Sequence, residues 1–62
     1  MTPEERKEAV AMLRGRAKDE RACGWSADAR GDAWTARKHS DNWRLLTLAA
    51  DELERKATDE TP

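Results

Sequence analysis

The side chains best suited to chemistry are one histidine, His39, and one cysteine, Cys23, with Asp41 as the nearest acidic neighbour of the histidine. Metal sites repeat such ligands at short spacings, as in CxxC or HExxH, and a chain with one of each has neither spacing. Cys23 is expected near the C-terminal end of a helix, whereas activated thiols favour helix N-termini. We therefore predict no catalytic residue, no metal site and no cofactor, and expect that the protein is not an enzyme.

Length and composition limit the chain to one small domain. It has 62 residues, of which 40% are charged, and a net charge of -1. A core of this size is marginal without disulfides, a metal or a partner, and a single cysteine cannot build a disulfide framework. The sequence lacks the apolar stretch of a signal peptide or a membrane span. We therefore expect a cytoplasmic protein that does not contact membranes.

Two stretches carry the signals of helices. Thr2-Pro3-Glu4-Glu5 has an N-cap, a proline in the first turn and a capping box, which predicts a helix over 3–22. Gly24 suits the left-handed end of this helix, and Ser26 suits the N-cap of a second helix over 27–57. A connection this short predicts an all-α antiparallel helical hairpin.

The remaining polar residues, 58–62, are expected to form a frayed C-terminal tail. A second break, within the second helix at Arg30-Gly31-Asp32, is an alternative, but helical spacing continues through it. We therefore prefer a continuous second helix, which makes the hairpin arms unequal. In that arrangement the helix beyond about Leu46 has no partner within the chain, which predicts that another chain covers it.

One apolar face runs along both helices and predicts self-association. Trp43, Leu46, Ala50 and Leu53 follow heptad spacing in the second helix, and Val10, Leu13 and Ala17 follow one face of the first. We expect these residues to form the core of a homodimeric four-helix bundle or a larger helical assembly. The full predicted self-association core is Val10, Leu13, Ala17, Ala36, Trp43, Leu46, Ala50 and Leu53.

A second face of the long helix is predicted to bind a protein partner. At roughly 100° per residue, Trp34, Leu45 and Leu48 lie almost opposite Trp43. Tryptophan and arginine are enriched at the energetic centres of protein interfaces. The candidate partner face comprises Arg30, Trp34, Arg37, Arg44, Leu45 and Leu48.

These patterns favour a small non-enzymatic interaction module that self-associates and binds or inhibits a protein target, for which a phage or mobile-element accessory protein is a plausible setting. A nucleic-acid-binding regulatory protein is one alternative, because Arg14, Lys18 and Arg21 share a face of the first helix. The low net charge and the interleaved acidic residues argue against it. A purely structural oligomerisation unit is the other alternative.

Overall fold

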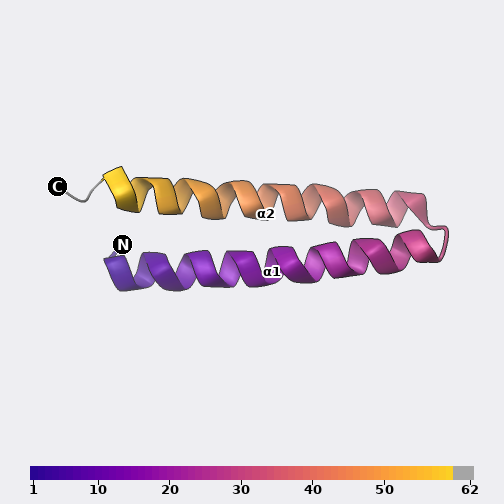
Figure 1. Cartoon of the computed structure of the whole chain (residues 1–62), viewed down its shortest axis with the longest axis horizontal. Helices are drawn as coiled ribbons and strands as arrows, with labels where there is room; N and C mark the ends of the chain where they lie inside the picture. Colours follow the sequence, from indigo (N-terminus) through magenta and orange to yellow (C-terminus); the bar gives the residue numbers. More distant parts are fainter. Residues whose placement is uncertain (60–62) are drawn as a thin grey trace.

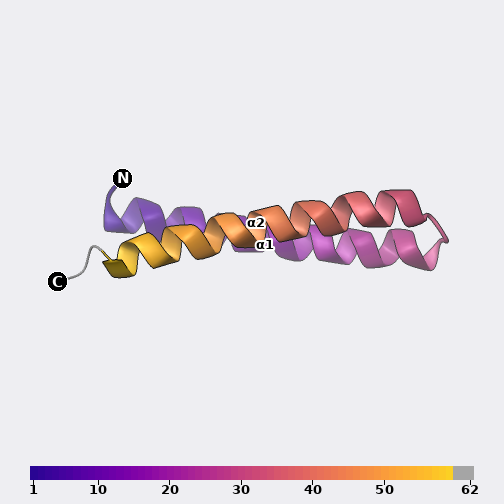
Figure 2. The same ribbon diagram turned by 90° about the horizontal axis from the view of Figure 1, so that it is seen from above.

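The computed structural model describes residues 1–59 as two helices of equal length lying side by side (Figure 1). Helix α1 spans Pro3–Ala29 and helix α2 spans Ala33–Asp59, with 27 residues in each. The helices are antiparallel and cross at a shallow angle (Figure 2). The hairpin measures 49 × 15 × 12 Å. The predicted all-α antiparallel hairpin is confirmed.

The start of α1 is fixed by the predicted capping box. The backbone N–H of Glu5 donates to Thr2 Oγ1 at 3.1 Å, and the backbone N–H of Thr2 donates to Glu5 Oε1 at 2.8 Å. Two amide groups that a helix start leaves without partners are satisfied in this way. Hydrogen bonds to the Glu5 carboxylate from the Thr2 backbone N–H, and to a lesser extent from the Thr2 side chain, lower the pKa of Glu5, since they favour its ionised form.

The turn lies at Arg30-Gly31-Asp32, so the predicted helix bounds, 3–22 and 27–57, are wrong. Gly31 has a φ of 78°, a left-handed conformation that glycine adopts without the cost borne by other residues. Asp32 then begins α2, because its Oδ1 accepts a hydrogen bond from the backbone N–H of Thr35 at 3.1 Å. Ser26, the predicted N-cap of the second helix, lies inside α1.

Gly24 has a packing role in place of the predicted turn role. It is buried within α1, and a Cβ atom built on it would lie 3.4 Å from His39 Cβ and 3.5 Å from the carbonyl oxygen of Ala36. A Cβ atom there would make ordinary van der Waals contacts with α2, so Gly24 packs directly against the facing helix. Gly15 differs, since nothing lies within 4 Å of its corresponding position.

The predicted unpaired end of the second helix is also wrong. With equal arms, α1 extends beside the C-terminal half of α2 (Figure 1). Leu46 and Leu53 are half-buried there, and Ala50 is completely buried. Leu46, Ala50 and Leu53, which were expected to need another chain, are therefore covered by α1 of the same chain, whereas Leu48 stays exposed.

The C-terminal end of α2 includes the first residues of the predicted tail. Thr58 and Asp59 belong to the helix, and 60–62 lie outside the described residues. Within the described part of the chain, neither helix combines the length and apolar character needed to cross a bilayer.

Replacing Gly31 by alanine should destabilise the hairpin by about 1 kcal/mol, because alanine is strained at a positive φ. Gly15→Ala is the matched control in the middle of α1, where open space and better helix propensity should stabilise the fold by about 0.5–1 kcal/mol. Urea unfolding of both variants at one protein concentration measures the difference. Equal effects of the two substitutions would contradict a turn at Gly31.

Candidate interaction surfaces

The predicted self-association core lies between the two helices of a single chain. Each of its residues is buried or half-buried there, and their part in self-association stays a prediction. Successive seam positions are separated alternately by three and four residues, the spacing of two helices that pack along their whole length. The seam positions are Val10, Leu13, Ala17, Glu20, Gly24 and Ala27 in α1, and Ala36, His39, Trp43, Leu46, Ala50 and Leu53 in α2.

His39 and Glu20 form a polar contact within this seam. His39 Nδ1 lies 2.5 Å from Glu20 Oε2, and both side chains are partly buried, with 30% and 22% of their surfaces exposed. An ionised carboxylate only accepts hydrogen bonds, so the histidine nitrogen donates. The hydrogen bond from His39 is the main cause of a lowered pKa of Glu20, with smaller contributions from Asn42 and Arg16. The contact joins α1 to α2 at one level of the hairpin.

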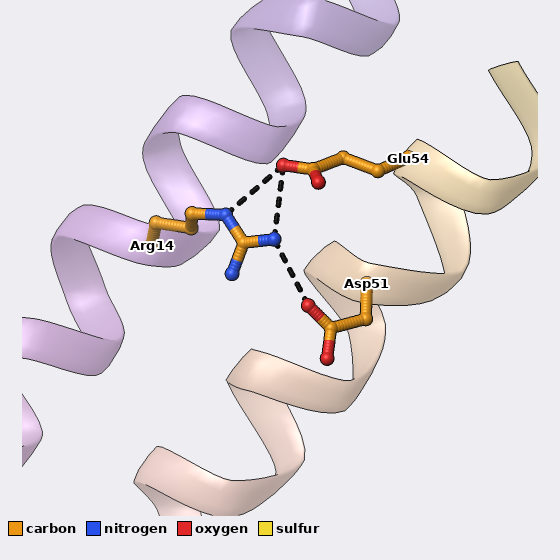
Figure 3. Close-up of polar contacts among 3 residues, drawn as sticks. All are labelled: Arg14, Asp51 and Glu54. Carbon is orange, nitrogen blue, oxygen red and sulfur yellow. Dashed lines mark hydrogen bonds and ion pairs between the residues drawn. The ribbon is translucent and has the colours of Figure 1, made fainter. Parts of the chain in front are cut away.

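An arginine joins the helices closer to their free ends. Arg14 in α1 extends to two carboxylates in α2 (Figure 3). Its Nη2 lies 2.9 Å from Asp51 Oδ1 and 2.9 Å from Glu54 Oε1, and its Nε donates to the same Glu54 oxygen at 3.1 Å. About half of each of these side chains is exposed, so the network adds little stability but favours one alignment of the two helices.

A third cluster surrounds Arg21 on one side of the hairpin. The guanidinium carbon of Arg21 lies 5.2 Å from the ring centroid of Trp25 and 4.8 Å from that of Trp43. Trp25 belongs to the same helix and Trp43 to the facing one, so the cation holds two aromatic rings across the seam. Arg21 is thereby engaged within the chain through cation–π contacts.

The space beside this cluster is a shallow open hollow of about 240 Å³. Its lining residues are Arg21, Gly24, Trp25, Asp28, Ala36, Ser40 and Trp43. The volume is below that of most small-molecule sites, which enclose roughly 300–1,000 Å³. Cys23 lies in α1 as a free, exposed thiol and does not line the hollow.

The largest exposed apolar side chains of α2 lie on its outer face, opposite the seam. Trp34 is 70% exposed, Leu45 is 64% exposed and Leu48 is 55% exposed. Their angular positions around the helix differ by about 60° at most, at roughly 100° per residue. We call this surface the outer face of α2, and define it as Trp34, Lys38, Asp41, Leu45, Leu48, Glu52 and Arg55.

The predicted partner residues are all exposed, but the structure does not bring all of them together. Arg37 and Arg44 border the outer face of α2 on one side. Arg30 instead caps the C-terminal end of α1 in the turn, where its Nη1 donates to Ser26 Oγ at 3.4 Å. The apolar part of the predicted face is thus a continuous helix surface, and Arg30 lies beyond its end.

Within residues 1–59, no three His, Cys, Asp or Glu side chains gather in a way that could hold a metal ion. His39, Glu20, Arg14 and Arg21 contact groups of the chain itself and do not converge on a shared cavity. Comparison with family models, with curated proteins and with solved structures returned no match. The exposed surfaces of the hairpin are therefore the features from which a function can be inferred.

Sequence reasoning missed the Glu20–His39 contact and the Arg14 network. Both depend on the alignment of the two helices, which the wrongly placed turn shifted. One signal was present: Glu20, Gly24 and Ala27 continue the three-and-four spacing of the first helix beyond Ala17. Because these three side chains are polar or small, the helix-packing pattern beyond Ala17 was not recognised from the sequence.

The Glu20–His39 contact makes stability depend on pH in a defined direction. The folded pKa of Glu20 is lowered from 4.5, so ionised Glu20 stabilises the hairpin above that pH, and this contribution is lost as the pH falls through the lower folded value. Glu20→Gln should therefore destabilise the protein at pH 7, and its effect should shrink on acidification. Urea unfolding at several pH values measures this.

Glu8→Gln is the matched control, because Glu8 is an exposed glutamate of the same helix on the side away from α2. It should leave the pH dependence close to that of the unmodified protein. A Glu20→Gln effect that is the same at pH 3 and pH 7 would show that ionised Glu20 does not stabilise the fold.

Proposed function

We propose that the protein is a small non-enzymatic protein–protein interaction module whose contact surface is the outer face of α2. The observation that carries the proposal is the exposure of Trp34, Leu45 and Leu48 on one side of a helix whose other side is already packed. Burying one such side chain contributes roughly 1.5–3 kcal/mol. A hairpin with a thin core has few other favourable contributions of this size.

The composition of the surface supports a protein partner. A tryptophan and two leucines supply apolar area, and Arg37 and Arg44 border it, a combination found at the centres and rims of protein interfaces. A shallow groove formed by Asp41, Arg44, Leu45 and Leu48 lies on the same face. An approaching side chain would meet both apolar and charged groups there.

The contacts of the basic residues give less support to nucleic-acid binding. Arg14 pairs with Asp51 and Glu54, and Arg21 contacts two tryptophan rings. Phosphate contacts by these arginines would compete with contacts that join the two helices. The exposed apolar face would also have no role in binding a phosphate backbone.

Site-specific photo-cross-linking in the cells that produce the protein tests this function. A photoreactive benzoylphenylalanine in place of Leu48 should give discrete protein adducts, because position 48 is expected to face a bound protein. Adding Leu45→Glu should abolish the adducts, since a charge in the apolar patch opposes burial. Denaturing gels and mass spectrometry identify the products.

The matched control places the same photoreactive residue at Met12, another large apolar side chain, which is 64% exposed but belongs to α1 and lies away from the outer face of α2. It should give only diffuse background. Similar adducts from both positions, or no adducts from position 48, would refute the proposed contact surface.

A further inference from the structure

The outer face of α2 has the spacing of a second helix-packing stripe. Its residues, at positions 34, 38, 41, 45, 48, 52 and 55, are separated alternately by four and three residues, as in the seam between α1 and α2. At 1.5 Å per residue the stripe extends about 32 Å. A straight stripe of this spacing fits another helix lying along it.

One pair of opposite charges on this stripe, Lys38 and Glu52, is placed symmetrically about Leu45. Lys38 lies seven residues before Leu45, and Glu52 lies seven residues after it. Trp34 and Arg55 lie eleven residues before and ten residues after the same leucine. An identical helix running in the opposite direction would therefore place a lysine level with a glutamate, and an arginine level with a tryptophan ring, on each side of Leu45.

We propose that the occupant of the outer face of α2 is α2 of a second copy of this chain, antiparallel to the first, with the twofold axis at Leu45. This inference rests on the proposed function, because it names the partner at the same surface. Leu45 packs on its counterpart, and Leu48 of each copy lies within one turn of Leu45 of the other. Lys38 pairs with the partner's Glu52, and Arg55 covers the partner's Trp34.

The charges select this arrangement over related ones. In a parallel pair, Lys38, Asp41 and Glu52 would each face their own counterparts, and like charges directly opposite destabilise packing. Moving the axis to a point between Leu45 and Leu48 would place Lys38 level with Arg55 and Asp41 level with Glu52, which again opposes like charges. Of these three arrangements, the antiparallel alignment at Leu45 is the one that places Lys38 level with Glu52 and Trp34 close to the level of Arg55.

Contacts within each copy hold the charged groups along the stripe. Lys38 Nζ lies 4.6 Å from the ring centroid of Trp34, and Arg55 Nη2 lies 2.5 Å from Glu52 Oε1. Both cations thus lie against residues of the outer face and are not directed away from it. A symmetric pair of this kind uses the same surface on both copies and closes without leaving a further apolar end to recruit more chains.

The test is a pair of charge reversals that repel themselves and attract each other. Lys38→Glu alone gives two acidic groups at each contact level, and Glu52→Lys alone gives two basic groups. Each variant should dimerise with a Kd raised about tenfold or more. An equimolar mixture should form heterodimers with an affinity close to that of the unmodified protein, as measured by sedimentation equilibrium and native mass spectrometry.

Recovery on mixing separates contacts between copies from contacts within one copy, because mixing cannot repair a lost intramolecular contact. Lys18→Glu and Glu8→Lys form the matched control pair, since they change the net charge equally on exposed parts of α1. Neither control should weaken the dimer, and mixing them should change nothing. A monomeric unmodified protein, or a Lys38→Glu dimer that is not rescued by Glu52→Lys, would overturn the inference.

Disulfide trapping tests the position of the axis. In a Cys23→Ser background, Leu45→Cys should oxidise rapidly to a covalent dimer, because the two copies of position 45 meet at the axis. Asp41→Cys should not, since its two copies lie about 12 Å apart along the helix direction. Rapid oxidation at both positions would indicate a parallel pair, and failure at position 45 would exclude an axis there; either result contradicts the proposed arrangement.

Failure of this inference differs from failure of the proposed function. Position 48 could cross-link only to a different protein, and mixing the charge-reversal variants could fail to restore the dimer. Together these results would support the contact surface but show that a second copy of the chain does not bind there. If neither cross-linked adducts nor self-association were detected, the proposed function and this inference would both be refuted.

Discussion

The packing of two helices along a seam that fully buries only small residues determines the rest of this structure. Among residues 1–56, Ala17, Gly24, Ala27 and Ala50 are buried, and no larger side chain is fully enclosed. The larger seam side chains, such as Leu13, Trp43 and Leu46, are only half-buried. The hairpin is therefore narrow and weakly stabilised by its own core, and the apolar outer face of α2 is where additional burial is available.

The sequence predicted the class of fold but not the position of the turn, because two local signals were nearly equivalent. Gly24 precedes Ser26, and Gly31 precedes Asp32, so each site offers a glycine followed by a capping residue. Local propensity cannot choose between them. The choice depends on pairing along the whole chain, since a turn at Gly31 gives every seam position a facing partner. The capping box at Thr2, in contrast, depends on adjacent residues only and was predicted correctly.

The same distinction applies to the surfaces. Exposure of Trp34, Leu45 and Leu48 on the side opposite Trp43 follows from helix geometry alone and survives an error in the turn. The partners of Glu20 and Arg14 require the exact alignment of two helices and were not predictable from spacing. Periodicity also shows that a face is packed without showing which chain packs on it. For this reason the residues predicted to form a core between two chains were not recognised as residues that pack between the two helices of one chain.

The turn at Gly31 also has a kinetic consequence. In an antiparallel hairpin, the separation in sequence between facing residues increases steadily from the turn towards the free ends. The entropy cost of closing a loop rises with its length, so the pairs nearest Gly31 close first and each reduces the loop that the next pair must close. Folding is therefore expected to proceed like a zipper from the turn, with the Glu20–His39 level joining before the level of Arg14 and Asp51. Unfolding would begin at the opposite end.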